Sequence, residues 1–293
     1  MDFKTVKPFI KWAGGKSQLL DMIRDKYPET IEKYCEPFVG GGAVLLDVLA
    51  NFKPKEVLIN DINSELINTY IHVKNNAESV IAWLFDMQTV FWKMNNDNRK
   101  DYFYSKRDRF NELILQSADT VEKAALFIFL NKTCFNGLYR VNGKGLYNVP
   151  IGSYKNPLIC DADNIHLISS LLQNVEIKCG DYSECAEFID KNTFVYIDPP
   201  YRPLNETSSF NSYAKTEFGD EQQIQLAHFV ELISQNGAKV VASNSDPKNT
   251  NENDNFFDDI YKKFIINRVS ASRMINSNSK GRGSINELLI YNY

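Results

Sequence analysis

The strongest constraint on the fold is a short apolar run, residues 193–197, that stops abruptly at Asp198, Pro199, Pro200 and Tyr201. The run is rich in residues that favour a buried strand. Proline has no backbone N–H to donate to a sheet, so both prolines must lie just beyond the end of that strand, where they fix the backbone. Asp198 and Tyr201 are therefore expected at the carboxyl edge of the strand, where open α/β sheets bind ligands.

This tetrapeptide suits a particular kind of ligand. A carboxylate and a proline carbonyl both accept hydrogen bonds, and an aromatic ring follows them in the sequence. Together they fit a flat substrate that carries an amino group, and a nucleobase meets that description. The alternative is an ordinary Asp-Pro turn at the exit of a strand.

Seven segments have the composition of strands, and several are followed by helical patterns. They are residues 34–38, 56–60, 175–179, 193–197, 239–243, 264–270 and 288–291. Such an order predicts an α/β sheet whose strands are mostly parallel. Between about residues 62 and 133 no strand pattern appears. The apolar spacing is instead helical at 66–71, 80–85 and 124–129, and a Gly-rich segment follows to about residue 158. We interpret this block as a helical insertion between two parts of the sheet.

The 293-residue chain has the balance of hydrophobic and charged residues of a soluble globular protein. No window approaches the roughly 20 apolar residues that a membrane span needs, so we expect a cytoplasmic protein that does not associate with membranes. The five cysteines are scattered and form no CxxC pair. We expect them to be reduced thiols, and we expect no metal site.

The net charge of −4 argues at first against a polyanionic partner, but the charges are unevenly distributed. Residues 131–160 and 260–286 contain no Asp or Glu. The basic residues of these two runs are Lys132, Arg140, Lys144, Lys155, Lys262, Lys263, Arg268, Arg273, Lys280 and Arg282. Two basic surfaces on an acidic body are typical of nucleic-acid binding, although two solvated loops would give the same pattern.

A glycine triplet, residues 40–42, follows the first strand-like segment and leads into a helical pattern. Glycine at such a junction lets the backbone turn sharply and approach a ligand. About twenty residues further on, a second apolar strand ends at Asp61, a position from which an acid accepts hydrogen bonds from ribose hydroxyls. The dinucleotide fingerprint GxGxxG is not met. A nucleoside cofactor without a pyrophosphate is therefore favoured, and S-adenosylmethionine fits.

Two further segments carry polar motifs. Residues 9–17 contain Gly-Lys-Ser but lack the first glycine of a phosphate-binding loop, since Ile10 stands there. Residues 131–154 combine Asn-Gly and Gly-Lys-Gly turns, which predicts a β-ribbon or an ordered loop. The Asn and Arg side chains of this segment are of the types that read base edges, and a surface hairpin is the alternative.

Together these motifs resemble the Dam-type DNA adenine-N6 methyltransferases, including the methylases of DpnII-like restriction systems, over essentially the whole chain. The family pattern of KWxGGK, EPFxGxG, an acidic strand end, NGLxRxN…FNVPxGxY and DPPY occurs here in the same order. The resemblance implies a Rossmann-like methyltransferase sheet made of residues 1–61 and 159–293, with a helical target-recognition domain inserted at 62–158.

The resemblance also implies S-adenosylmethionine as the methyl donor and double-stranded DNA as the partner. The residues that match the family's cofactor-binding positions are Trp12, Lys16, Phe38, Gly40, Asp61, Asp181 and Asp198. A cognate restriction endonuclease is expected as a functional, not a physical, partner.

The sequence that the resemblance implies as the target is GATC. The matching DNA-binding residues are Asn136, Leu138, Arg140, Asn142, Pro150 and Tyr154. Arg140 is expected to read a guanine, and Tyr154 to help at the outer guanine. Leu138 and Pro150 are expected to touch the central A·T step. Ser153 stands where many relatives have a basic residue, so a phosphate or base contact is expected to be weaker.

The expected chemistry is direct in-line methyl transfer to the amino nitrogen of a flipped adenine. Tyr201 is expected to stack on the base, while Asp198 and the Pro199 carbonyl accept its two N–H groups. Cytosine-C5 methylation is disfavoured because it needs a Pro-Cys pair, and no cysteine follows a proline. Two alternatives stay open. One is an amino methyltransferase for cytosine N4, RNA or a protein glutamine, and the other is a DNA-binding protein without catalysis.

Overall fold

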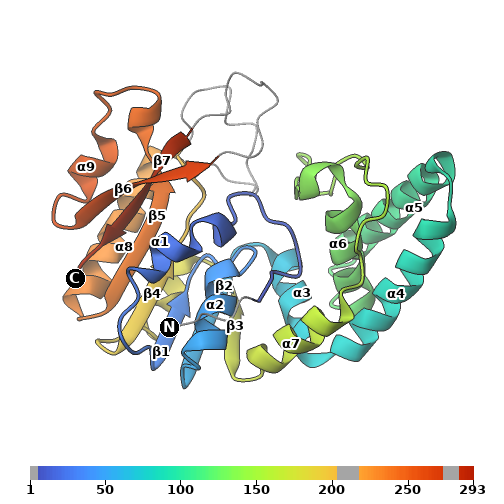
Figure 1. The fold of residues 1–293 in the computed structure, drawn as a ribbon, viewed down its shortest axis with the longest axis horizontal. Helices are drawn as coiled ribbons and strands as arrows, with labels where there is room; N and C mark the ends of the chain where they lie inside the picture. The colour runs from blue at the N-terminus through green and yellow to red at the C-terminus, as the bar shows by residue number, and fades with distance from the viewer. Residues whose placement is uncertain (1–5, 203–217, 273–283) are drawn as a thin grey trace.

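The computed structural model describes residues 6–202, 218–272 and 284–293, with the backbone alone at 271–272 and 284–285. A seven-stranded sheet in the order β3-β2-β1-β4-β5-β7-β6 forms its centre (Figure 1). The strands are β1 (Lys33–Glu36), β2 (Glu56–Asp61), β3 (Val175–Cys179), β4 (Thr193–Ile197), β5 (Lys239–Ser245), β6 (Ile265–Ser272) and β7 (Ser284–Tyr291). All seven predicted strands are confirmed, with shifts of a few residues at their ends.

Strands β1–β5 pair in parallel, and β7 runs antiparallel to both β5 and β6, so six of these seven strands point the same way. The central pair, β1 and β4, is joined in parallel with Cys35 opposite Val195. The chain passes to β2 and β3 on one side of this pair and to β5 on the other. The carboxyl ends of β1 and β4 therefore lie at a topological switch point, which is the usual ligand site of an open α/β sheet. The glycine triplet and Asp198 follow these two ends.

Alternate residues of the central strands enter two different apolar clusters. Tyr34 and Tyr196 belong to one cluster, while Cys35 and Val195 belong to the other. This period of two is that of a sheet with both faces covered. The helices α1 (Leu20–Arg24), α2 (Ala43–Asn51), α3 (Ser64–Asn75) and α7 (Ala162–Leu172) supply the first cluster, and α8 (Asp220–Gln235) and α9 (Phe256–Ile260) the second.

The helical block between β2 and β3 forms a lobe beside the sheet (Figure 1). It contains α4 (Ala77–Lys93), α5 (Asn96–Leu115) and α6 (Val121–Thr133), and α6 packs against α3, α4 and α5. Asn63 caps α3, since its side chain accepts from the N–H groups of Glu65 and Leu66. Because α3 also contacts β3, one continuous apolar cluster joins the lobe to the sheet. The domain division at 61/62 and 158/159 stays a prediction.

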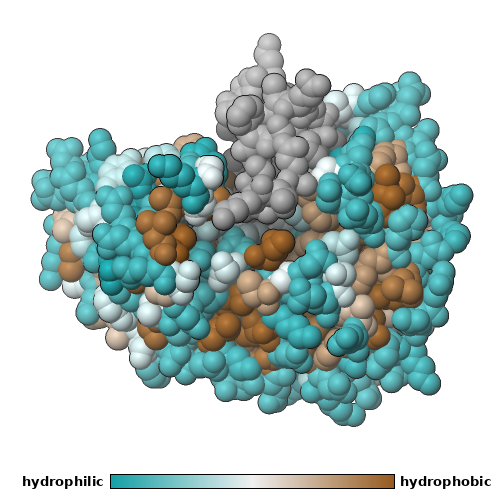
Figure 2. Space-filling view, turned by 180° about the vertical axis from the view of Figure 1, so that it is seen from behind, coloured by the Kyte–Doolittle hydropathy of each residue, from teal (hydrophilic) through white to brown (hydrophobic). Residues whose placement is uncertain are grey.

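Figure 2 shows the reverse face, where apolar patches are separated by hydrophilic residues. Exposed large apolar side chains on α4 are Trp83, Phe85, Val90 and Trp92. Within the described parts of the chain, no helix combines the length and apolar character needed to cross a membrane.

Candidate active site

Asp198 leaves β4 at the centre of the carboxyl edge and meets a buried cation. Its Oδ1 atom lies 2.8 Å from Nζ of Lys16, and the hydroxyl of Ser243 on β5 donates to the same oxygen at 2.9 Å. The side chain of Lys16 is 4% exposed and that of Asp198 is 19% exposed. Burial raises the pKa of Asp198, while Lys16 and Ser243 act in the opposite direction. The carboxylate is thus partly desolvated beside its counter-ion.

Tyr201 is held at both its ring and its hydroxyl. Nζ of Lys16 lies 4.6 Å from the ring centroid, within the range of a cation–π contact. The hydroxyl donates to Oε2 of Glu287 on β7 at 2.7 Å. Burial raises the pKa of Tyr201 well above its usual value, and the charges of Asp198 and Glu287 add to the effect. The hydroxyl is therefore a donor at neutral pH.

The two prolines differ in their surroundings. Pro199 is buried and Pro200 is exposed. The carbonyl of Pro200 accepts a hydrogen bond of 2.9 Å from Nε2 of Gln223, a fully buried residue of α8. Gln223 in turn accepts from Nδ2 of Asn244 at 3.1 Å. A buried amide pair therefore fixes the backbone between Asp198 and Tyr201.

The glycine triplet turns sharply beside this group. Gly40 and Gly42 have φ angles of +47° and +72°, which other residues rarely adopt. A Cβ atom on Gly40 would lie 2.8 Å from the indole of Trp12. The N–H groups of Gly40 and Asn63 donate to Asp61 at 3.1 and 2.9 Å. Burial raises the pKa of Asp61 to about 6, although these backbone bonds oppose the shift.

These residues fit an adenosine. Oδ2 of Asp61 accepts the N–H of Gly40 and Oδ1 that of Asn63, and with its remaining lone pairs the carboxylate can also accept a ribose hydroxyl. Phe38, just before the turn, lies 5.3 Å from the ring of Tyr182 and 5.9 Å from that of Phe218. An aromatic group beside the acid suits a purine. Asp181 is exposed and caps the short helix Tyr182–Cys185 through the N–H of Ser183.

The N-terminal segment links this edge to the helical lobe. The indole of Trp12 stacks on Tyr139 and Phe127, with ring centroids 6.0 and 6.5 Å apart. Asn131 of α6 accepts from the N–H of Lys11 and donates to the Lys11 carbonyl, both at 2.8 Å. Trp12 therefore lies between the glycine triplet and the lobe, while Lys16 lies beside Asp198.

Comparison with known proteins decides the family. The profile of the D12 class N6 adenine-specific DNA methyltransferases matches residues 12–275. The chain belongs to this family. DNA is thus the substrate of this methyltransferase, adenine is the methylated base, and the family implies S-adenosylmethionine as the methyl donor.

Curated relatives cover nearly the full length of the methyltransferase. The Type II methyltransferase M.MjaIII of Methanocaldococcus jannaschii is 48% identical over 98% of this chain and 99% of its own length. The Type II methyltransferase M1.LlaDCHI of Lactococcus lactis is 38% identical, over 98% and 96%. The DNA adenine methylase of Haemophilus influenzae is 36% identical, over 97% and 92%.

The segment expected to recognise DNA is an ordered loop on the lobe, as predicted. Two isolated antiparallel bridges, Cys134 to Ile151 and Val141 to Tyr147, hold it together. Four of its predicted DNA-binding residues are exposed and two are half-buried. The exposed ones are Asn136, Arg140, Asn142 and Pro150, and the half-buried ones are Leu138 and Tyr154.

Two of these side chains have partners within the loop. Nε of Arg140 donates to Oδ1 of Asn148 at 2.8 Å, which orients the guanidinium at the surface. Oδ1 of Asn142 accepts from the N–H groups of Lys144 and Leu146, so this side chain closes its own turn. Tyr154 accepts from Nζ of Lys11 at 3.2 Å and thus lies beside the N-terminal segment.

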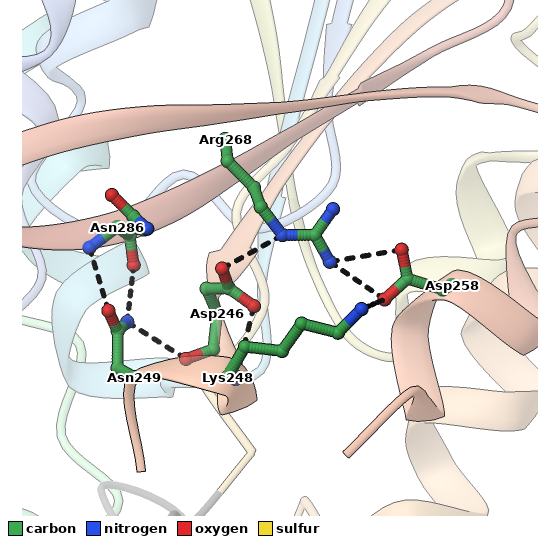
Figure 3. A network of polar contacts seen from close by, with 6 residues as sticks. All are labelled: Asp246, Lys248, Asn249, Asp258, Arg268 and Asn286. Atoms are coloured by element: carbon green, nitrogen blue, oxygen red, sulfur yellow. Dashed lines mark hydrogen bonds and ion pairs between the residues drawn. The ribbon is translucent and has the colours of Figure 1, made fainter. Parts of the chain in front are cut away.

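The second basic run is largely neutralised where it is described. Arg268 of β6 pairs with the fully buried Asp246 and with Asp258 (Figure 3). Lys263 pairs with Glu231. The three remaining basic residues of the run that lie outside the described ranges are Arg273, Lys280 and Arg282. Two of the three described basic residues of this run are therefore paired with acids, and the third, Lys262, is exposed.

Four side chains near the methyltransferase site had no role assigned from the sequence. They are Glu36, Gln223, Ser243 and Glu287. Glu36 is buried at the end of β1, where it accepts from the Tyr34 hydroxyl at 2.6 Å. An acid at the end of an apolar strand was a usable signal for Glu36. Among the residues described, no group of His, Cys, Asp and Glu side chains is arranged to hold a metal ion.

Proposed function

We propose that the enzyme methylates N6 of the adenine in GATC within double-stranded DNA, after flipping that base out of the helix. The observation that carries the proposal is the contact of Asp198 with Lys16 and Ser243 beside Tyr201, at the end of β4, next to the strand β1 that leads into the glycine triplet. It places an acceptor, an aromatic ring and the candidate cofactor turn at one sheet edge.

Base flipping follows from the depth of the site. A stacked adenine cannot present its amino group to a carboxylate that is 19% exposed at a sheet edge. Extruding the base costs a few kcal/mol of stacking and pairing. Stacking of the extruded ring on Tyr201 would recover part of this cost, since base–aromatic stacking contributes about 1–3 kcal/mol.

Asp198 then prepares the amino nitrogen for attack. The lone pair of an adenine amino group is delocalised into the ring, which makes the nitrogen a poor nucleophile. Lys16 and Ser243 both contact Oδ1, so we assign Oδ2 to one N–H of the substrate and the Pro199 carbonyl to the other. These acceptors stabilise the positive charge that develops on nitrogen. S-adenosylmethionine, when bound, supplies an electrophilic methyl group.

The remaining proposed contacts divide between the cofactor and DNA. In this proposal the residues that bind S-adenosylmethionine at the sheet edge are Trp12, Phe38, Gly40, Asp61 and Asp181. The inserted lobe, residues 62–158, binds DNA. Arg140 donates hydrogen bonds to a guanine through the two terminal nitrogens of its guanidinium. Type II methyltransferases among the relatives support a role beside a restriction endonuclease.

A plasmid assay tests the proposal. Plasmid DNA is incubated with the enzyme and S-adenosylmethionine, then digested with one endonuclease that GATC adenine methylation blocks and one that requires it. We expect resistance to the first and cleavage by the second, with N6-methyladenine as the only new nucleoside by mass spectrometry. N6-methyladenine at another sequence would contradict GATC. N4-methylcytosine would instead support the alternative amino methyltransferase.

The Asp198→Ala variant tests the assigned chemistry. It should retain the circular dichroism of the wild type and lose methyl transfer to GATC duplexes. Substantial residual transfer would contradict the role of Asp198.

A further inference from the structure

Glu287 is the only acidic residue among the described residues of β7, and it reaches across the sheet edge to the tyrosine of the catalytic tetrapeptide. Its Oε2 accepts the hydrogen bond of the Tyr201 hydroxyl at 2.7 Å. The two residues come from strands on either side of β5. The contact therefore ties the antiparallel end of the sheet to the loop that follows β4.

The backbone around Glu287 is anchored by a polar network. Glu287 lies opposite Ser245 at the last position of β5. The preceding residue, Asn286, exchanges two hydrogen bonds with the side chain of Asn249, of 2.9 and 2.7 Å (Figure 3). Asn249 also donates to the carbonyl of Asp246 at 2.8 Å. The position of the Glu287 backbone is thus fixed from the loop that follows β5.

Ion pairs around one buried carboxylate secure this loop in turn. Asp246 is fully buried and accepts from Nε of Arg268 at 3.0 Å, and the same guanidinium contacts Asp258 at 2.7 Å (Figure 3). Lys248 adds a second cation 3.0 Å from Asp258. Loss of Arg268 would leave the buried carboxylate of Asp246 without its cation, which is costly, so this pair holds the loop in place. A rigid support is what a residue needs if it is to orient another side chain.

From these contacts we infer that Glu287 is a positioning residue for capture of the target base, because it sets the orientation of the Tyr201 ring. This inference rests on the proposed function. A tyrosine ring can rotate about two side-chain bonds. A hydrogen bond at the hydroxyl fixes the direction of the ring through the first rotation, and because a phenol O–H prefers to lie in the ring plane, a fixed acceptor also restrains the second. Stacking depends on the ring plane, so a fixed ring presents its face to an extruded base without first having to be ordered.

The carboxylate of Glu287 is also a suitable acceptor for the Tyr201 hydroxyl. The pKa of Tyr201 is raised well above its usual value by burial and by neighbouring carboxylates, which keeps the hydroxyl proton in place. A hydrogen bond to a charged acceptor is stronger than one to a neutral acceptor. Lys16, 4.6 Å from the ring centroid, restrains the ring from a second direction. Loss of Glu287 therefore frees the hydroxyl end while the cation contact is retained.

A double-mutant cycle tests the inference. The variants are Glu287→Ala, Glu287→Gln, Tyr201→Phe and the double variant Glu287→Ala/Tyr201→Phe. The control is Glu176→Ala, which removes an exposed glutamate that contacts Lys178 on the edge strand β3. The measurements are kcat and KM on a GATC duplex, the fluorescence of 2-aminopurine at the target position, and S-adenosylmethionine affinity by calorimetry.

We expect Glu287→Ala to lower kcat/KM and the 2-aminopurine signal about tenfold, with unchanged cofactor affinity. Glu287→Gln keeps an oxygen acceptor and should stay within about threefold of the wild type. In the Tyr201→Phe background, Glu287→Ala should cost nothing further, because the hydroxyl is already absent. Glu176→Ala should behave as the wild type.

Additive losses in the double variant would overturn the inference, since they would mean that Glu287 acts without Tyr201. An unchanged 2-aminopurine signal in Glu287→Ala would overturn it as well. Failure of the wild type to methylate GATC would contradict the proposed function, and the cycle would then be repeated on the thermal unfolding midpoint. Non-additive losses of that midpoint would still support the contact, and additive losses would contradict it.

Discussion

The ammonium of Lys16 lies 2.8 Å from the carboxylate of Asp198, and both groups are largely withdrawn from water. Desolvation disfavours the charged form of Asp198 and raises its pKa, whereas the nearby cation favours that form. The ionisation of Asp198 therefore depends on Lys16. An acceptor for an amino group must be ionised, so this dependence has a measurable consequence for activity.

Replacement of Lys16 by Met should shift the pH profile of kcat. Without the cation, desolvation of Asp198 is unopposed by Lys16 and its pKa rises further. Activity requires the ionised form, so the acidic limb of the profile should move to higher pH. The loss at pH 6.5 should exceed the loss at pH 8.5, measured at saturating S-adenosylmethionine. Lys55→Met, which removes an exposed ion pair with Glu32, is the control. An equal loss at every pH would contradict the prediction.

Cofactor affinity should weaken as the pH falls through about 6. Burial raises the pKa of Asp61 to about 6, so below that pH the carboxyl is protonated and loses acceptor capacity for ribose hydroxyls. Affinity for S-adenosylmethionine should fall by up to about tenfold per pH unit below the pKa. Calorimetry from pH 5 to 8 measures this. In Asp61→Asn the dependence should be flat, and a variant curve parallel to that of the wild type would refute the role of Asp61.

Glu36 should make the wild type less stable as the pH rises. Its folded pKa is raised well above the ordinary value by burial, and the charges of Asp198 and Asp61 add to the shift. Between the unfolded and the folded pKa the native state binds more protons, so the free energy of unfolding falls by up to about 1.4 kcal/mol per pH unit. Glu36→Gln should remove this slope. The difference in melting temperature between variant and wild type should therefore grow from pH 5 to pH 8. A difference that stays constant with pH would contradict the predicted role of Glu36.

The sheet was predictable because its strands are buried on both faces or end in breakers. Residues 193–197 are apolar throughout and stop at two prolines, and β4 has those bounds. The predicted segment 34–38 extends beyond β1, which ends at Glu36. The next residue is Pro37, which cannot donate to the ladder.

Among the described helices, the longest, α5, was not indicated by apolar spacing. In α5 the fully buried apolar residues are Phe103, Phe110 and Leu113, and polar residues dominate the rest of the helix. Packing against α6, which is buried on nearly all sides, stabilises α5 more than its own pattern suggests. Helices of this kind depend on tertiary contacts that a local pattern does not contain.

The candidate site was predictable where the chain supplies a local motif. Asp198 and Tyr201 are neighbours in sequence, and their place at a strand end follows from the prolines. Ser243 and Glu287 come to them across the sheet from β5 and β7. Such partners depend on strand order and register, and a single Ser or Glu in a strand does not reveal either.

Arg140 should determine specificity at one guanine of the target. The residue is exposed on the recognition loop, and Asn148 orients its guanidinium through Nε. A bidentate Arg–guanine pair contributes about 1–3 kcal/mol of discrimination, so Arg140→Ala should lower kcat/KM on GATC by about 10- to 100-fold. Duplexes with one guanine replaced should lose less activity, because the variant no longer distinguishes them from GATC.

Lys144→Ala, at the exposed tip of the same loop, is the matched control. It should weaken all duplexes by a similar small factor and reduce the salt dependence of binding. Equal losses on cognate and altered duplexes in Arg140→Ala would show that Arg140 contacts the phosphate backbone instead of a base.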